Sequence, residues 1–435
     1  MPKTSTRSKV TGPYLEAFGR FAGNGAGKSP QWLAKRRQAA MDRFAEVGFP
    51  DTRQEDWRFT DVKKIASTEF TLALPPEIEG LSTEDVRANV LTDHAHQVVF
   101  VNGFFAPSLS QVDQLPAGVL VGSLRAALED HGELVEQHLG KYARDEETPF
   151  TALNMAFLRD GAFVYLPKNA VLKRPIELLF LALPDDGSAL LWHPRTLVIA
   201  DRGAQGAVVE NFVGLGDDTY WVNAVSEVIL EENANLDTYR VQRDGNAAFH
   251  TANTQSYQAR SSNYSQVAFA FGGALTRHDI NAVLDGEGAD CTIDGLSVLS
   301  GRQHVDFHTT LDHAQPHCTS WEYFNGVFDE RARGVFNGRI VVRPGAQRTD
   351  SKQTNNNLLL SKHARADSQP QLEIYADDVK CTHGATLGPI DERQLFYLQS
   401  RGFDRESARG LLTYGFCAEI LNTLKLEGFK KRLEA

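Results

Sequence analysis

The sequence is poor in cysteine and has no long apolar run. Only four of its 435 residues are cysteines, and none of them forms a Cys-x-x-Cys pair. Sparse thiols of this kind are typical of a reduced intracellular protein, and they exclude a disulfide framework and a zinc motif recognisable by its spacing. No apolar stretch reaches the roughly 20 residues that a membrane-spanning helix needs, and no apolar signal segment follows the first residues. We therefore expect a cytoplasmic protein without a membrane partner.

An excess of positive charge is also missing. The formal net charge is -11, which disfavours nucleic acid as a partner because that surface would repel phosphates. Apolar residues at 42% and charged residues at 23% are ordinary values for a globular protein, so wholesale disorder is excluded.

Common catalytic motifs are absent as well. There is no G-x-S-x-G nucleophile elbow, no Ser-x-x-Lys pair and no glycine-rich dinucleotide fingerprint. The run AGNGAGKS resembles the end of a phosphate-binding P-loop, but Ala22 stands where the first glycine is needed and no buried strand precedes it. We expect no enzymatic activity and no nucleotide chemistry in this chain.

The N-terminal third divides into two predicted parts. Residues 1–28 are rich in glycine, serine, threonine and basic side chains, and predict a flexible N-terminal arm. Ser29 followed by Pro30 is typical of a helix start, and apolar residues recur on one face until Gly48. Residues 29–149 are therefore predicted to form an N-terminal helical domain.

Residues 150–390 have a different pattern, in which short β-prone runs alternate with brief polar turns. An alanine follows a small or polar residue in five of these turns: Ala204, Ala234, Ala289, Ala346 and Ala364. Their spacing, near 20–30 residues or twice that, favours a β-solenoid whose coils stack on one another. A β-sandwich is the alternative, but it needs regular hairpin signals, which are sparse here.

Residues 391–435 are predicted to form a C-terminal helical domain. Gly402 breaks the first helix, and Asp404 begins a second one whose apolar stripe includes Ala408, Leu411 and Ile420. A helix pair after a solenoid would either cover the last coil or offer an apolar face to a partner.

Three polar residues near the middle of the core are candidate metal ligands. His304, Asp306 and His308 fall at i, i+2 and i+4, so a strand would present all three on one side. Imidazole and carboxylate groups in this arrangement could hold iron, zinc or manganese. The alternative is a ladder of hydrogen-bonded side chains on the surface of a β-coil.

The second candidate lies where the strand pattern gives way to a helical one. Cys381 and His383 are two residues apart, so an extended chain would point both side chains to one face. Sulfur and imidazole can both bind a metal, but one of each cannot fill a tetrahedral site. A buried cysteine beside a hydrogen-bonded histidine is the alternative interpretation.

The residues around this junction resemble a known family. The segments Phe336–Ser368 and Gln369–Phe403 are similar to the SufB/SufD family of iron-sulfur cluster assembly proteins, and the likeness extends over about residues 150–425. Cys381–Thr386, with the sequence CTHGAT, resembles the SufD form, and so does the element Arg53–Thr60.

This resemblance implies a mainly β fold, with a right-handed parallel β-helix core between N-terminal and C-terminal helical domains. It also implies a non-catalytic subunit of a cluster assembly scaffold, which pairs with a SufB-like subunit and a SufC-like ABC ATPase to build and transfer nascent clusters. By the same resemblance His383, and more weakly Cys381, would hold iron or a transient cluster shared with the partner subunit. The chain alone would bind no cofactor tightly. A homodimer in isolation is an alternative that the sequence leaves open.

The resemblance further places ATPase binding on the C-terminal helices. The apolar patch with one charge that suits such a contact comprises Phe396, Tyr397, Leu398, Arg401 and Gly402. Two other functions stay open at this point. One is a polysaccharide-active β-helix enzyme, and the other is a metal-dependent enzyme that uses His304, Asp306 and His308.

Overall fold

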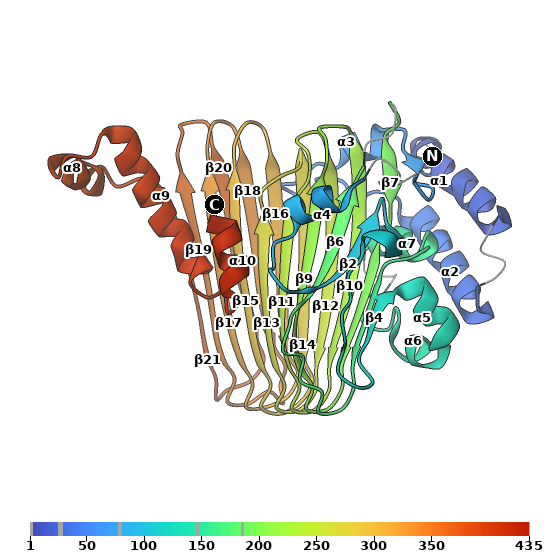
Figure 1. The fold of residues 1–435 in the computed structure, drawn as a ribbon. Coiled ribbons are helices and arrows are strands. Elements are labelled where there is room, and N and C mark those ends of the chain that lie inside the picture. Colours follow the sequence, from blue (N-terminus) through green and yellow to red (C-terminus); the bar gives the residue numbers. More distant parts are fainter. Residues whose placement is uncertain (1–2, 25–28, 77–80, 145–147, 184–186, 435) are drawn as a thin grey trace.

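The computed structural model describes residues 3–24, 29–76, 81–144, 148–183 and 187–434. Its strands form a long stack, with one group of helices at the N-terminal end and a second group beside the C-terminal end (Figure 1). The helices are α1 Lys3–Asn24, α2 Gln31–Val47, η2 Glu55–Trp57, α3 Lys63–Ser67, α4 Thr83–Asn89, η3 Pro107–Leu109, α5 Leu124–Asp130, α6 Gly132–His138, α7 Pro149–Ala156, α8 Glu392–Ser400, α9 Arg405–Leu421 and α10 Glu427–Glu434. Within the described ranges, none of them has the length and apolar character needed to cross a bilayer.

The strands belong to two sheets. They are β1 Thr71–Leu72, β2 His96–Val101, β3 Phe104–Phe105, β4 Leu120–Ser123, β5 Ala162–Leu166, β6 Ile176–Ala182, β7 Leu190–Trp192, β8 Arg195–Ala200, β9 Gln205–Gly214, β10 Tyr220–Leu230, β11 Asn235–Arg243, β12 Phe249–Gln258, β13 Asn263–Ala270, β14 Leu275–Leu284, β15 Asp290–Leu299, β16 His304–His313, β17 Thr319–Phe328, β18 Arg333–Val342, β19 Asp350–Leu359, β20 Arg365–Ile374 and β21 Lys380–Pro389. From β8 onward the chain alternates between an 11-stranded and a 10-stranded sheet.

Parallel pairing between alternate strands makes this core a β-solenoid. β10 pairs with β12, β12 with β14, and so on to β20, while the odd-numbered strands pair in the same way to β21. Side chains that hydrogen-bond across neighbouring coils are 24 to 34 residues apart. The predicted parallel β-solenoid is therefore confirmed, and the β-sandwich is excluded because its strands would pair mostly antiparallel.

The repeated alanines explain how the chain turns between sheets. Ala204, Ala234, Ala289, Ala346 and Ala364 are all buried and belong to the apolar cluster that fills the solenoid. Four of them directly precede a strand, and Ala346 lies in the turn before β19. A larger side chain at these buried positions would have to displace its packed neighbours.

The predicted flexible arm at residues 1–28 is wrong over most of its length, because Lys3–Asn24 forms α1. Tyr14, Phe18 and Phe21 share one helix face and are buried. The Tyr14 ring lies 5.6 Å from that of Phe44 in α2, so aromatic packing orders a segment whose composition suggested disorder. Residues 25–28 lie outside the described residues.

The predicted boundary between residues 149 and 150 does not separate helices from strands. β2 pairs in parallel with β6, and β4 pairs antiparallel with β5, so residues before the boundary begin both sheets. At this end the sheets finish in the short strands β3 and β4, and α5 packs beside β4. Local helical patterns could not reveal these pairings because their partners lie far along the chain.

A buried ion pair fastens this N-terminal region to the first coils. Arg195 in β8 and Glu227 in β10 are both fully buried, and Arg195 Nη2 lies 2.8 Å from Glu227 Oε2. The same carboxylate accepts hydrogen bonds from three backbone N–H groups of the loop after α6, those of Gly140, Tyr142 and Ala143. The charge of Glu227 is therefore fully compensated without water.

The C-terminal region contains three helices where a pair was predicted, since α10 follows α9. Asp404 caps α9 as expected, with its side chain accepting a hydrogen bond from Ser407 N. α9 and α10 pack against the outer face of the 10-stranded sheet, where Phe429 meets the rings of Tyr239 and Phe269. They do not continue the sheets, so β20 and β21 are the edge strands of the last coil within the described ranges.

Candidate functional site

Cys381 and His383 lie on β21, at the open end of the solenoid. Their Cα atoms pair with those of Ser351 and Gln353 in β19, and β21 has no other strand neighbour in the described structure. Alternation along the strand places both side chains on one face. Cys381 is half-buried against the apolar cluster inside the solenoid, so this face looks inward, while His383 is exposed because no further coil covers it.

The Cys381 thiol and the His383 imidazole differ in how easily they could bind a metal. Burial, and next the charge of Asp350, raises the pKa of the Cys381 thiol, so metal binding there must release a proton. The imidazole of His383 has no hydrogen-bond partner in the described part of the chain and lies at the surface. His383 is therefore the more accessible donor, with Cys381 next to it on the same strand face.

The coil beneath this pair has a polar interior that sequence reasoning missed. Gln353 stacks in register below His383, and its Nε2 donates a 2.6 Å hydrogen bond to Glu322 Oε2 in β17. Ser351, below Cys381, lies 2.6 Å from Ser320 through their hydroxyl oxygens. Polar residues at inward positions of β17 and β19 were visible in the sequence, but only the strand register shows that they lie in line with Cys381 and His383.

Glu322 predicts a specific dependence of stability on pH. Burial raises its pKa to about 7, whereas the unfolded chain releases the same proton near 4.5. The free energy of unfolding should therefore fall as pH rises from about 4.5 through about 7, because ionisation favours the unfolded chain. Glu322→Gln is expected to remove up to about 3 kcal/mol of this decrease, measured by urea denaturation at pH 5 and pH 8. The exposed Glu287→Gln is the control, and an equal decrease in wild type and Glu322→Gln would contradict the prediction.

The row of His304, Asp306 and His308 is occupied by contacts with other protein groups. All three residues share the outer face of β16, as predicted, but they face other protein groups. Thr60 donates to Asp306 and lies 2.9 Å from His304 Nε2, and Arg277 Nη1 donates to Asp306 at 2.8 Å. Across the described residues, no group of three or more histidines, cysteines or acids is arranged to hold a metal ion.

Electrostatics explain why this row is structural. Burial alone would raise the pKa of Asp306, but Arg277 and His308 outweigh it and hold that pKa below its ordinary value. Burial lowers the pKa of His304 to about 4, so its imidazole is neutral. The ionised Asp306 and the Arg277 guanidinium, which lies 4.1 Å from the Trp57 ring, anchor the N-terminal element to the coil.

The patch predicted to bind an ATPase lies on α8 and the turn that follows it. Phe396 and Tyr397 are 73% and 57% exposed, Leu398 is half-buried, and Arg401 Nη2 donates to the Tyr397 hydroxyl at 3.0 Å. Gly402 has a φ of +97°, which ends the helix as expected. α8 extends away from the strand stack in Figure 1, so this patch is far from any sheet face.

Sequence reasoning missed a second exposed apolar set on the neighbouring helix. The predicted stripe of α9 is only partly covered, because Leu411 is 46% exposed although Ala408 and Ile420 are buried. Phe403 and Tyr414 are exposed as well. Their sequence positions carried no signal, since exposure depends on how α9 crosses the sheet.

Comparison with known proteins gives two family matches that together span most of the chain. Residues 183–416 match the family model described as "SUF system FeS cluster assembly, SufBD core domain". Residues 9–178 match the model described as "SufBD protein N-terminal region".

Individual relatives are similar over nearly their full length. The chain is 34% identical to an iron-sulfur cluster assembly SufBD family protein of Synechocystis, covering 94% of this chain and 91% of the relative. It is 30% identical to the iron-sulfur cluster assembly protein SufD of Escherichia coli, covering 95% and 93%. Its identity to the protein of the same description from Bacillus subtilis is also 30%, covering 98% and 97%.

Proposed function

Because the chain belongs to the SufBD family of iron-sulfur cluster assembly proteins, we propose that it acts as the SufD-type, non-catalytic subunit of a cytoplasmic assembly scaffold. In this role it pairs with a homologous SufB-like subunit and with a SufC-like ABC ATPase. The complex builds nascent clusters and transfers them to other proteins.

The open end of the solenoid is the observation that carries this proposal. β20 and β21 each present an unpaired strand edge ten residues long, and β21 bears Cys381 and His383. Unpaired edges of this length favour addition of strands from another chain, and a homologous solenoid end would supply matching strands. A second copy of this chain would occupy the same edges when the SufB-like subunit is absent.

Strand addition would also complete the ligand set for the cargo. One thiolate and one imidazole leave a tetrahedral iron with two open positions, and a cluster requires still more ligands. Donors from the facing subunit would fill these positions, so iron or a nascent cluster would be held only at the assembled interface. This explains why the chain alone would bind no cofactor tightly.

The ATPase would bind the exposed apolar surface of α8 and α9. Phe396 and Tyr397 offer aromatic area at the centre of such a contact, and Arg401 stacked on Tyr397 offers charge beside it. α9 and α10 are anchored to the sheet through Phe429 and its neighbours. A force applied by the ATPase to these helices would therefore reach the coils that precede the open end.

Affinity capture of the tagged chain from its own cells tests this function. Wild type should retain both an ABC-type ATPase and a second SufBD-family chain, and loss of both would contradict the proposal. Phe396→Ala combined with Tyr397→Ala should reduce the recovered ATPase about tenfold or more, since hot-spot aromatics dominate such contacts, and should leave the SufBD-family chain unchanged. Val171→Ala, an exposed apolar residue near the other end, is the control. Undiminished ATPase in the double variant would place its contact elsewhere.

A further inference from the structure

A large cavity is lined in part by α1 and α2, which lie at the opposite end of the strand stack from β21 with Cys381 and His383 (Figure 1). Its volume is about 970 Å³, within the range of pockets that hold small organic ligands. Its walls come from α1, α2 and the residues just before it, the segment around β1, β3, α5, and the loop between α7 and β5. No step of the proposed cluster assembly uses this space.

Most of the wall is apolar and partly aromatic. The apolar side chains that line it include Phe21, Phe70, Leu72, Leu74, Phe104 and Leu128. Leu74 is 67% exposed, so it lies where the cavity opens to solvent. A surface of this kind suits a flat apolar group that stacks against aromatic rings.

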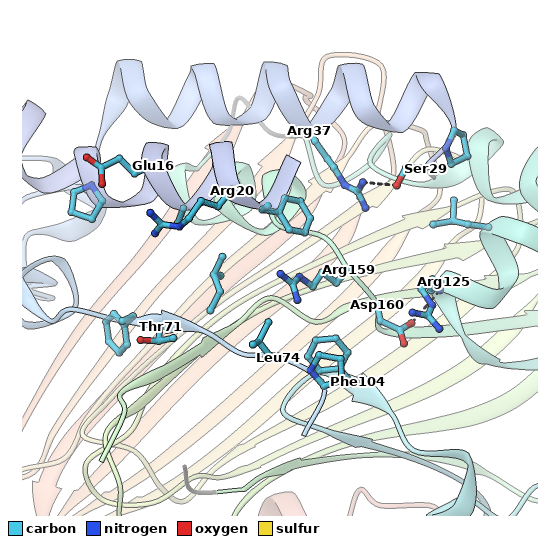
Figure 2. Close-up of a pocket in the computed structure, with 18 of the residues that line it drawn as sticks. Glu16, Arg20, Ser29, Arg37, Thr71, Leu74, Phe104, Arg125, Arg159 and Asp160 are labelled. Atoms are coloured by element: carbon cyan, nitrogen blue, oxygen red, sulfur yellow. Dashed lines mark hydrogen bonds between the residues drawn. The ribbon is translucent and has the colours of Figure 1, made fainter. Parts of the chain in front are cut away.

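Two arginines from different elements meet in this apolar space. The Arg37 guanidinium of α2 lies 5.4 Å from the centroid of the Phe21 ring, and that of Arg159 lies 5.1 Å from the same centroid. Figure 2 shows Arg159 in the space beneath α1, whereas Arg37 extends from α2 toward Ser29, with which it forms a hydrogen bond. Like charges drawn together in an apolar cavity repel each other unless an anion lies between them.

Arg37 is also incompletely satisfied. Its side chain is 95% buried, since only 5% is exposed, and its Nε has no hydrogen-bond partner in the described structure. The terminal nitrogens donate to Ser29 Oγ at 2.6 Å and to the carbonyl oxygen of Leu158. Burial, and next the charge of Arg159, lowers the pKa of Arg37 to about 10, so it stays charged at neutral pH.

No carboxylate in the described ranges forms an ion pair with either arginine. Asp160 lines the cavity, but its carboxylate already accepts hydrogen bonds from Ser123 Oγ at 2.7 Å and from the backbone N–H groups of Gly161, Arg125 and Phe105. Arg159 itself makes only a 3.5 Å contact with the carbonyl oxygen of Ala73. Glu16 and Glu129 also line the cavity, but within the described residues neither forms an ion pair with Arg37 or Arg159. The buried Arg37 and the partly exposed Arg159 therefore have no directly paired carboxylate in the described structure.

We propose that this cavity binds a small organic anion, in which an oxyanion group lies between Arg37 and Arg159 and a flat apolar body packs against Phe21 and Phe104. Arg159 could bind the carboxylate, sulfonate or phosphate oxygens with two parallel hydrogen bonds, and Arg37 would add its charge and its unpartnered Nε. The aromatic walls would select ligands with a ring system over the free inorganic ion.

Fluorescence titration of the full chain with 8-anilinonaphthalene-1-sulfonate tests the proposal, because this probe joins a sulfonate to flat rings. Saturable one-to-one binding is expected, and Arg159→Gln should weaken it about tenfold, as expected for loss of charged hydrogen bonds. Arg159→Lys, which keeps the charge, should restore part of the affinity. Leu74→Glu, at the exposed mouth, should also weaken binding, while the exposed Arg302→Gln changes the net charge equally and should have no effect.

Competition distinguishes the two parts of the ligand. 2-Naphthoate should displace the probe at far lower concentration than inorganic phosphate. Equal displacement by phosphate would overturn the role of the apolar body. Probe affinity unchanged in both Arg159→Gln and Leu74→Glu, with thermal unfolding unaltered, would overturn the site itself.

Discussion

His383→Ala is expected to lower the rate of cluster assembly by the purified complex about tenfold or more, while the complex stays intact. The side chain is exposed and has no hydrogen-bond partner in the described structure, so its removal should cost the fold little. As the accessible donor at the open end, however, it would supply one of few ligands to the cargo, and loss of metal-site residues costs at least this factor. Absorbance of the forming cluster and the iron bound per complex measure the effect.

The controls separate a ligand role from a structural one. His363→Ala removes an exposed histidine from the turn between β19 and β20 and should assemble clusters at the wild-type rate. Cys381→Ser is expected to have a smaller effect than His383→Ala, because its half-buried thiol must first lose a proton. A normal assembly rate in His383→Ala, with both partners still bound, would remove this residue from the site.

Glu227→Gln should lower the free energy of unfolding by about 3–5 kcal/mol, the typical cost of breaking a buried ion pair by changing one partner. The substitution keeps the shape but leaves the fully buried Arg195 without its counter-charge. It also weakens the acceptor for three backbone N–H groups in the loop after α6. Urea denaturation followed by circular dichroism gives the change.

A surface ion pair provides the matched control. Glu232 is 38% exposed in its side chain and lies 3.9 Å from Arg202, so Glu232→Gln should cost less than about 1 kcal/mol. If Glu227→Gln cost no more than this control, Arg195 would have found water or another acceptor. The N-terminal region would then be fastened to the coils by its other contacts, among them apolar packing and the hydrogen bonds of Asp306 and Arg277.

The solenoid could be predicted because its signals are local. Each of these signals lies within one coil: the strand runs, the sparse hairpin turns, and the alanines from Ala204 to Ala364. They can therefore be recognised in the sequence without knowledge of distant contacts. The helix α1 could not be predicted in the same way. Its glycines and serines suggested disorder, but Tyr14 packs on Phe44 of α2, and Phe18 and Phe21 pack on Phe157, more than a hundred positions later.

For the candidate sites as well, local features could be predicted and tertiary contacts could not. Spacing correctly placed His304, Asp306 and His308 on one strand face, and likewise Cys381 and His383. Residue spacing does not reveal what lies against each face. Thr60, 244 residues earlier than His304, covers the face of β16 that bears His304, whereas the face of β21 that bears His383 is left open. What lies against a strand face is decided by tertiary contacts, which a local pattern does not record.

The two ends of the solenoid differ in a way that limits how large an assembly can grow. One end finishes in the long edges of β20 and β21, and the other in the short strands β3 and β4 beside helices. Short or covered edges resist pairing, so a chain can join another through only one of its ends. If chains join by the proposed strand addition, growth would therefore stop after two chains and give a closed pair, where a solenoid open at both ends would form filaments.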